Sequence, residues 1–129
     1  MGWQVIKKNI QMQRVSGEPF VSINKKGLFL FNSAATTLID KDGKYQYAQF
    51  LLDEEGNPPI IAVKFSVNEV DDGYKIHRSV VSGKSTNAIS ISNVYVCRNY
   101  FLKDGNESSR VRYRVEKIED DILQITTEM

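Results

Sequence analysis

The residue types that carry out covalent or metal chemistry are scarce in this sequence. His77 is the only histidine and Cys97 the only cysteine. Nucleophilic catalysis needs a base oriented beside the nucleophile, and a zinc site needs more ligands than one histidine and one cysteine supply. We therefore expect His77 to be a half-exposed strand residue and Cys97 a small buried thiol on a helix face. Because no glycine-rich phosphate loop occurs either, the sequence predicts a non-enzymatic protein without cofactor or metal.

Carboxylates gather in three short segments, each of which lies in a predicted turn. Their spacing does not match a calcium-binding loop, so we expect solvated turn tips with no binding role. The three groups are Asp53-Glu54-Glu55, Glu69-Asp71-Asp72 and Glu119-Asp120-Asp121.

Arginines form a regular pattern near the C-terminus. Arg110, Arg112 and Arg114 alternate along a strand-like segment, so their side chains would share one face while Val111 and Tyr113 point to the other. Such a stripe can contact phosphates, and Tyr113 among the arginines resembles the aromatic and basic mixture that binds single-stranded nucleic acid. The competing interpretation is a solvated strand face paired with nearby carboxylates, with Tyr113 packed in the core or at its rim.

Two lysines and then a third occupy expected hairpin tips. Lys25 and Lys26 lie in the turn "NKKG", and Lys84 lies in the turn "SGKSTN" of a later hairpin. Contacts from both tips to the phosphates of a duplex would position the protein without reading the base sequence, and binding would depend on salt.

Short strands must position these cations, because apolar and polar residues alternate over most of the chain. Turn formers such as "NKKG" and "DEEGNPP" separate the strands and predict hairpins. The expected strands cover residues 10–13, 20–23, 28–31, 44–52, 59–67, 74–81 and 88–92, with a final hairpin over 110–128 that turns near 119–121.

Two short helices are expected, each directly after a strand. Ser33 is a good N-cap for a helix over 34–39, because its hydroxyl can accept a hydrogen bond from a free backbone N–H of the first turn. A Ser-Asn pair likewise precedes the helical pattern at 94–102. There Val94, Cys97 and Phe101 follow the spacing of one helix face, although the β-branched valines leave a strand possible.

The order of elements occurs twice. Two units, residues 20–67 and 74–127, each read as strand, turn, strand, capped helix, strand, turn, strand, and the polar linker 68–73 separates them. Leu28 to Ser33 match Ala88 to Asn93 at an offset of 60. One unit alone has too little interior to bury its apolar face, whereas two interleaved units share a core and close each other's sheet edges.

A β-β-α-β-β unit such as "GLFLFNSAATTLI…DGKYQYAQFLLDEEGNPPIIAVKF" resembles the AbrB family of swapped-hairpin DNA-binding domains, and "AISISNVYVCRNYFL…SRVRYRVEKIEDDILQI" resembles it too. The MraZ-like members of that family carry both units in one chain. The family's corner proline is replaced here by Asn32 and Ser92, and of its basic helix residues only Arg98 is present. The resemblance implies an interleaved barrel and a role in transcription control.

Composition is that of one ordinary globular domain over residues 1–129. Apolar residues make up 41% and charged residues 26% of the chain, and 17 Lys and Arg against 16 Asp and Glu give a net charge of +1. Such a balance gives no whole-protein attraction to phosphate, so any basic surface must be local. With one cysteine and no apolar run of signal-peptide or membrane-span length, we expect a cytoplasmic protein without a membrane partner.

The expected fold class is thus α+β and mostly β, with two similar β-β-α-β-β halves in a swapped-hairpin barrel. The expected function is DNA binding in transcription control. The alternatives are a protein-interaction module on the same barrel, alone or as a homo-oligomer, and a single-stranded nucleic-acid binder. The residues expected to contact DNA are Lys25, Lys26, Lys84, Arg98, Arg110, Arg112 and Arg114.

Overall fold

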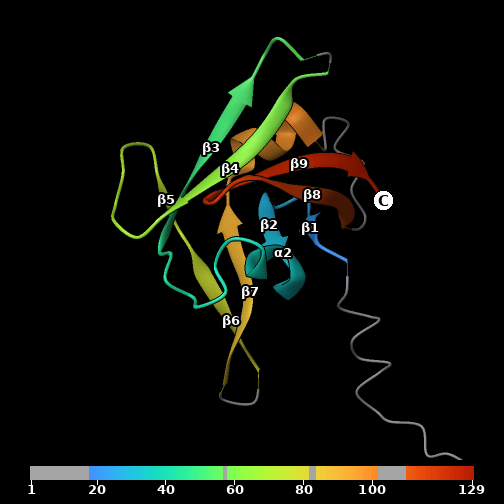
Figure 1. The fold of residues 1–129 in the computed structure, drawn as a ribbon. Helices are drawn as coiled ribbons and strands as arrows, with labels where there is room; N and C mark the ends of the chain where they lie inside the picture. The colour runs from blue at the N-terminus through green and yellow to red at the C-terminus, as the bar shows by residue number, and fades with distance from the viewer. Residues whose placement is uncertain (1–17, 57, 82–83, 102–109) are drawn as a thin grey trace, which may run out of the picture.

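The computed structural model describes residues 18–56, 58–81, 84–101 and 110–129, with only the backbone considered for 79–81 and 84–86. The strand expected at 10–13 lies outside these residues. Within them, one antiparallel sheet of nine strands forms the body of the protein (Figure 1). Its strands are β1 (Phe20–Ile23), β2 (Leu28–Phe31), β3 (Tyr47–Asp53), β4 (Ile60–Ser66), β5 (Tyr74–Lys75), β6 (His77–Val81), β7 (Lys84–Ser92), β8 (Val111–Glu119) and β9 (Ile122–Glu128).

The hairpins of the two halves alternate around the sheet. The strand order is β5-β3-β4-β9-β8-β1-β2-β7-β6, so the hairpin β3–β4 of the first half is followed by β9–β8 of the second, then by β1–β2 and β7–β6. Each hairpin is therefore flanked by strands of the other half. The prediction of an α+β, mostly β fold in a barrel-like sheet, with the hairpins of the two halves interleaved, is confirmed.

The sheet nearly closes on itself where the chain passes from β5 to β6. These strands are the two ends of the strand order, yet only Ile76 separates them. Ile76 is buried, and its N–H donates to the carbonyl of Gln46, just before β3. The prediction of a single strand over 74–81 is therefore wrong, because β5 pairs with β3 whereas β6 pairs with β7.

Inward-facing side chains fill the barrel with apolar atoms. The alternation in β2 and in residues 88–92 of β7 buries every second residue, which is how a strand with one solvated face is expected to behave. Burial of these side chains is the main driving force for the fold. The largest fully buried residues are Val21, Ile23, Phe29, Phe31, Val63, Phe65, Ile89, Ile91, Leu123, Thr36 and Cys97.

The helices follow β2 and β7, at opposite ends of this antiparallel strand pair (Figure 1). Helix α2 (Ser33–Thr37) is capped by Asn32, whose Oδ1 accepts from the N–H of Ala35 at 2.9 Å. The expectation that Ser33 caps this helix is wrong, because Ser33 is already its first helical residue. Asn93 caps the second helix through the N–H of Val96 at 3.1 Å.

The second helix changes its winding after one turn. Helix α3 (Val94–Val96) continues as the π-helical turn η1 (Cys97–Phe101). Cys97 is fully buried and Phe101 packs against Phe29 at 5.7 Å between ring centroids, but Val94 is 45% exposed. The expected apolar face is thus correct for Cys97 and Phe101 and wrong for Val94.

Candidate nucleic-acid interface

The turn between β1 and β2 presents Lys25 and Lys26 to solvent. Asn24 builds this turn, because its Oδ1 accepts from the N–H of Lys26 at 3.0 Å and of Leu28 at 3.2 Å. Gly27 completes the turn with φ +84°, a conformation that glycine adopts without strain. Both lysines are exposed, as the turn "NKKG" predicted.

The same turn packs directly against the second helix. The carbonyl of Gly27 accepts from the N–H of Asn93 at 2.8 Å, and the carbonyl of Asn24 accepts from the thiol of Cys97 at 3.3 Å. A Cβ on Gly27 would lie 2.7 Å from the Cα of Val94. The hairpin of the first half and the helix of the second are therefore in contact through their backbones.

This contact places cations from both halves at one end of the barrel. Arg98 follows Cys97 and is exposed on η1. Arg110, also exposed, precedes Val111, which pairs with Ile23 at the end of β1, so it lies beside Asn24. We call Lys25, Lys26, Arg98 and Arg110 the basic end. None of these four cations forms an ion pair with another described residue.

An aromatic ring that the sequence prediction did not single out lies at the basic end. Tyr95 is 69% exposed and sits three residues before Arg98, a spacing at which helical side chains are neighbours. The side chain of Asn99 donates to the carbonyl of Tyr95 at 2.7 Å. The sequence signal for Tyr95 was its position outside the apolar face formed by Cys97 and Phe101.

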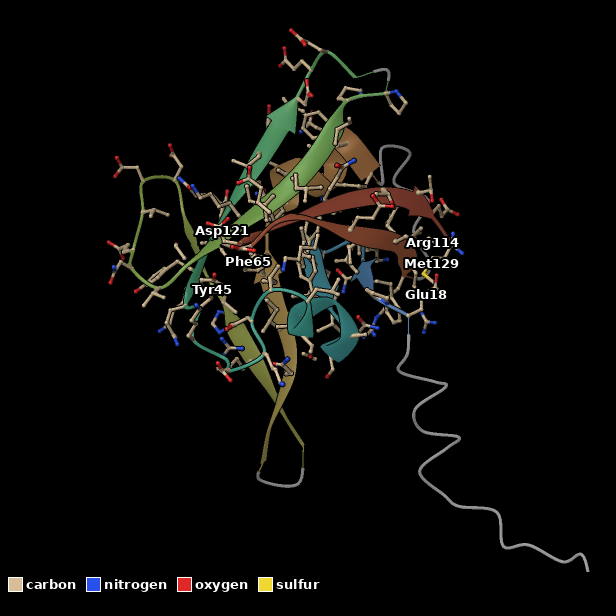
Figure 2. All side chains as sticks on the ribbon, in the orientation of Figure 1. Glu18, Tyr45, Phe65, Arg114, Asp121 and Met129 are labelled. Atoms are coloured by element: carbon tan, nitrogen blue, oxygen red, sulfur yellow. The ribbon has the colours of Figure 1, made fainter. Side chains whose placement is uncertain are left out.

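Further along β8, the next two arginines of the stripe have partners within the protein. The guanidinium of Arg112 lies 4.8 Å from the centre of the Phe20 ring. Arg114 donates from Nε to Oε1 of Glu18 at 2.9 Å, and the pair lies beside the C-terminal Met129 (Figure 2). The competing interpretation of a strand face paired with carboxylates is therefore correct for Arg114.

Lys84 lies far from the basic end. It is the first residue of β7 and not part of a loop over 82–87 as expected. Because Leu28 pairs with Ser92 at the other end of β7, eight residues separate Lys84 from the turn of the first hairpin, on the order of 25 Å along an antiparallel strand. The two hairpin tips thus lie at opposite ends of the β2–β7 pair and do not form one surface.

Tyr113 is not available for stacking on bases. Its ring faces the barrel interior, where it contacts Phe101 at 5.0 Å between centroids. Burial, reinforced by the charge of Glu128 and by Cys97, raises the pKa of Tyr113 above its ordinary value. Packing at the rim of the core, the alternative considered for this ring, is what the structure shows.

The other candidate groups do not assemble into a site. His77 is exposed on β6, more than the half-exposure expected, while Cys97 is buried as expected. Among the described residues, no group of three or more His, Cys, Asp or Glu could hold a metal ion. No helix in the described ranges has the length and apolar character needed to cross a membrane.

No protein-family model, curated protein or solved structure matches this chain.

Proposed function

We propose that this protein is a non-enzymatic DNA-binding protein, of the AbrB- or MraZ-like transcription-regulator type, and that its basic end lies against the phosphate backbone. One observation supports the proposal. Two segments about seventy residues apart, the turn with Lys25 and Lys26 and the η1 turn with Arg98, are held together by backbone contacts, and their cations form no ion pair among the described residues. Cations carried on segments that are held together in this way can contact phosphates without a rearrangement of the backbone.

The interface is narrower than the sequence predicted. Lys25, Lys26, Arg98 and Arg110 remain the proposed phosphate contacts. Arg112, stacked on Phe20, lies next along β8 and would contribute at the margin. Arg114 is paired with Glu18, and Lys84 lies at the far end of β7, so neither is included among the proposed phosphate contacts.

Salt dependence of DNA binding tests the proposal. Four phosphate contacts predict that log K falls against log salt with a slope of about −3 to −4 for a duplex. Replacing Lys25 and Lys26 together by Ala should weaken binding and flatten the slope by about two units. Fluorescence anisotropy of a random-sequence duplex at several salt concentrations measures both quantities.

Lys41 provides the matched control. It is an exposed lysine in the loop after α2, at the end of β2 remote from the basic end. Lys41→Ala should leave the slope unchanged. A Lys25→Ala, Lys26→Ala variant with the wild-type slope, or no binding by the wild-type protein at low salt, would contradict the proposed function.

A protein-interaction module is the second candidate function. The hairpin β3–β4 projects beyond the rest of the barrel (Figure 1), and its Leu51 and Leu52 are 37% and 41% exposed. Such a hairpin could contact another protein through these leucines. Absence of DNA binding at low salt would favour this candidate.

A further inference from the structure

We infer that Tyr95 stacks on an unpaired base, so that the preferred ligand of the basic end is a strand with at least one base outside a duplex. The inference rests on the proposed function and specifies its ligand. It also moves the stacking role from Tyr113 on β8, which packs at the rim of the core, to Tyr95 on α3.

Tyr95 faces solvent on the helix that packs against the turn of Lys25 and Lys26. Its neighbours Val96 and Cys97 turn into the core, with 7% and 0% of their surface exposed, while Tyr95 keeps 69% exposed. Among the described residues, Tyr95 has no ring partner of its own. One face of the ring is therefore open to a planar ligand.

The ring is mounted on a rigid support. The backbone contact between Gly27 and Val94 fixes the first turn of α3, and the bond from Asn99 to the carbonyl of Tyr95 fixes the next. The π-helical turn that follows is a rare feature, frequently found at functional sites. Tyrosine has few rotatable bonds, so it stacks at a low cost in conformational entropy.

The surrounding charges select a nucleic-acid strand as the occupant. Lys25, Lys26 and Arg98 lie around the helix that carries Tyr95, and they supply the cations that a phosphate backbone needs. Aromatic rings beside such cations are the usual arrangement in proteins that bind single strands. In an intact duplex each base is covered by its neighbours, so only an unpaired base offers its face to the ring.

Two oligonucleotides and three variants test the inference. The probe is a single strand with one 2-aminopurine, whose fluorescence falls when the base stacks, and its fully paired duplex is the comparison. Wild-type protein should quench the single strand and bind it more tightly than the duplex. Tyr95→Ala should abolish the quenching and weaken single-strand binding about 5- to 150-fold, with an unchanged salt slope. Tyr95→Phe keeps the ring and should bind as the wild type does.

The outcomes separate the inference from the proposed function. If Tyr95→Ala binds the single strand as tightly as the wild type while Lys25→Ala, Lys26→Ala binds more weakly, the stacking inference is wrong and the phosphate interface stands. If the wild type binds only the duplex, the inference is wrong as well. If the wild type binds neither probe at low salt, both the stacking inference and the proposed function are wrong. Because Tyr95 is exposed, circular dichroism should show an unchanged fold in Tyr95→Ala and in Tyr95→Phe.

Discussion

Gly27 lies where the first hairpin meets the second helix, and its missing side chain is what lets the two backbones touch. A Cβ there would lie 2.7 Å from the Cα and 2.8 Å from the N of Val94. Real Cβ atoms do not approach backbone atoms this closely, so one segment would have to move. Gly27 also has φ +84°, which adds strain for any residue with a side chain.

Replacing Gly27 by Ala should therefore cost more than the same change at Gly43. Both glycines have positive φ, which costs alanine about 1–2 kcal/mol, but a Cβ on Gly43 meets only ordinary contacts at 3.8 Å. Overpacking against Val94 should add about 1–3 kcal/mol to the loss at Gly27. Urea denaturation measures the difference, and equal losses in the two variants would show that the turn can move away from the helix.

At the scale of elements, each corner between strand and helix depends on one asparagine. Asn32 does more than cap α2, because its Oδ1 also accepts from the N–H of Phe20 at 3.1 Å and its Nδ2 donates to the carbonyl of Glu18 at 2.8 Å. It therefore joins the start of β1 to the end of β2. Asn93 caps the second helix, and its backbone N–H donates to the carbonyl of Gly27 in the first hairpin.

Asn32→Ala should lower the free energy of unfolding by about 2–3 kcal/mol. About 1 kcal/mol is the usual effect of losing an N-cap, and the two bonds to Phe20 and Glu18 account for the rest. Ser33→Ala is the matched control, with an expected loss within about 0.5 kcal/mol because the cap is not at Ser33. Chemical denaturation of both variants measures the two free energies of unfolding. Similar losses of stability would mean that the side chain of Ser33 also stabilises the corner between β2 and α2.

At the scale of the whole molecule, an ion pair connects the halves. Arg78 on β6 donates from Nη2 to Oδ2 of Asp40 at 3.0 Å and to the carbonyl of Tyr45 at 2.6 Å. Asp40 lies in the loop after α2, is 2% exposed, and also accepts from the N–H groups of Lys44 and Tyr45. The first half's loop is thus bound to the second half's edge strand near the point where the barrel closes.

Arg78→Met should destabilise the barrel by about 2–3 kcal/mol, because it leaves the buried carboxylate of Asp40 without its charged partner. The loss is limited since Nη1 of Arg78 is buried and has no hydrogen-bond partner among the described residues. Arg114→Met breaks the exposed pair with Glu18 and should cost at most about 1 kcal/mol. Thermal unfolding of the two variants measures the difference. An equal fall in Tm for Arg78→Met and Arg114→Met would show that Arg78 does not stabilise the contact between the halves.

Local features of the interface were predictable for a simple reason. The turn "NKKG" carries its own geometry in Asn24 and Gly27, so the exposure of Lys25 and Lys26 follows from neighbouring residues alone. The same holds for the alternation that places Phe29 and Phe31 inside. The position of Lys84 could not be predicted in this way, because its distance from that turn depends on how β2 pairs with β7.

Within the described residues, the sequence by itself determined most of the strands, the two capped corners within one residue and the buried state of Cys97. Each depends on interactions between residues close in the chain or on the simple need to bury apolar side chains. Only the tertiary structure decided that Arg98 lies near Lys25 and Lys26, that Arg114 pairs with Glu18, and that the ring of Tyr95 is exposed. These depend on strand register and on backbone contacts between distant segments, which local periodicity does not encode.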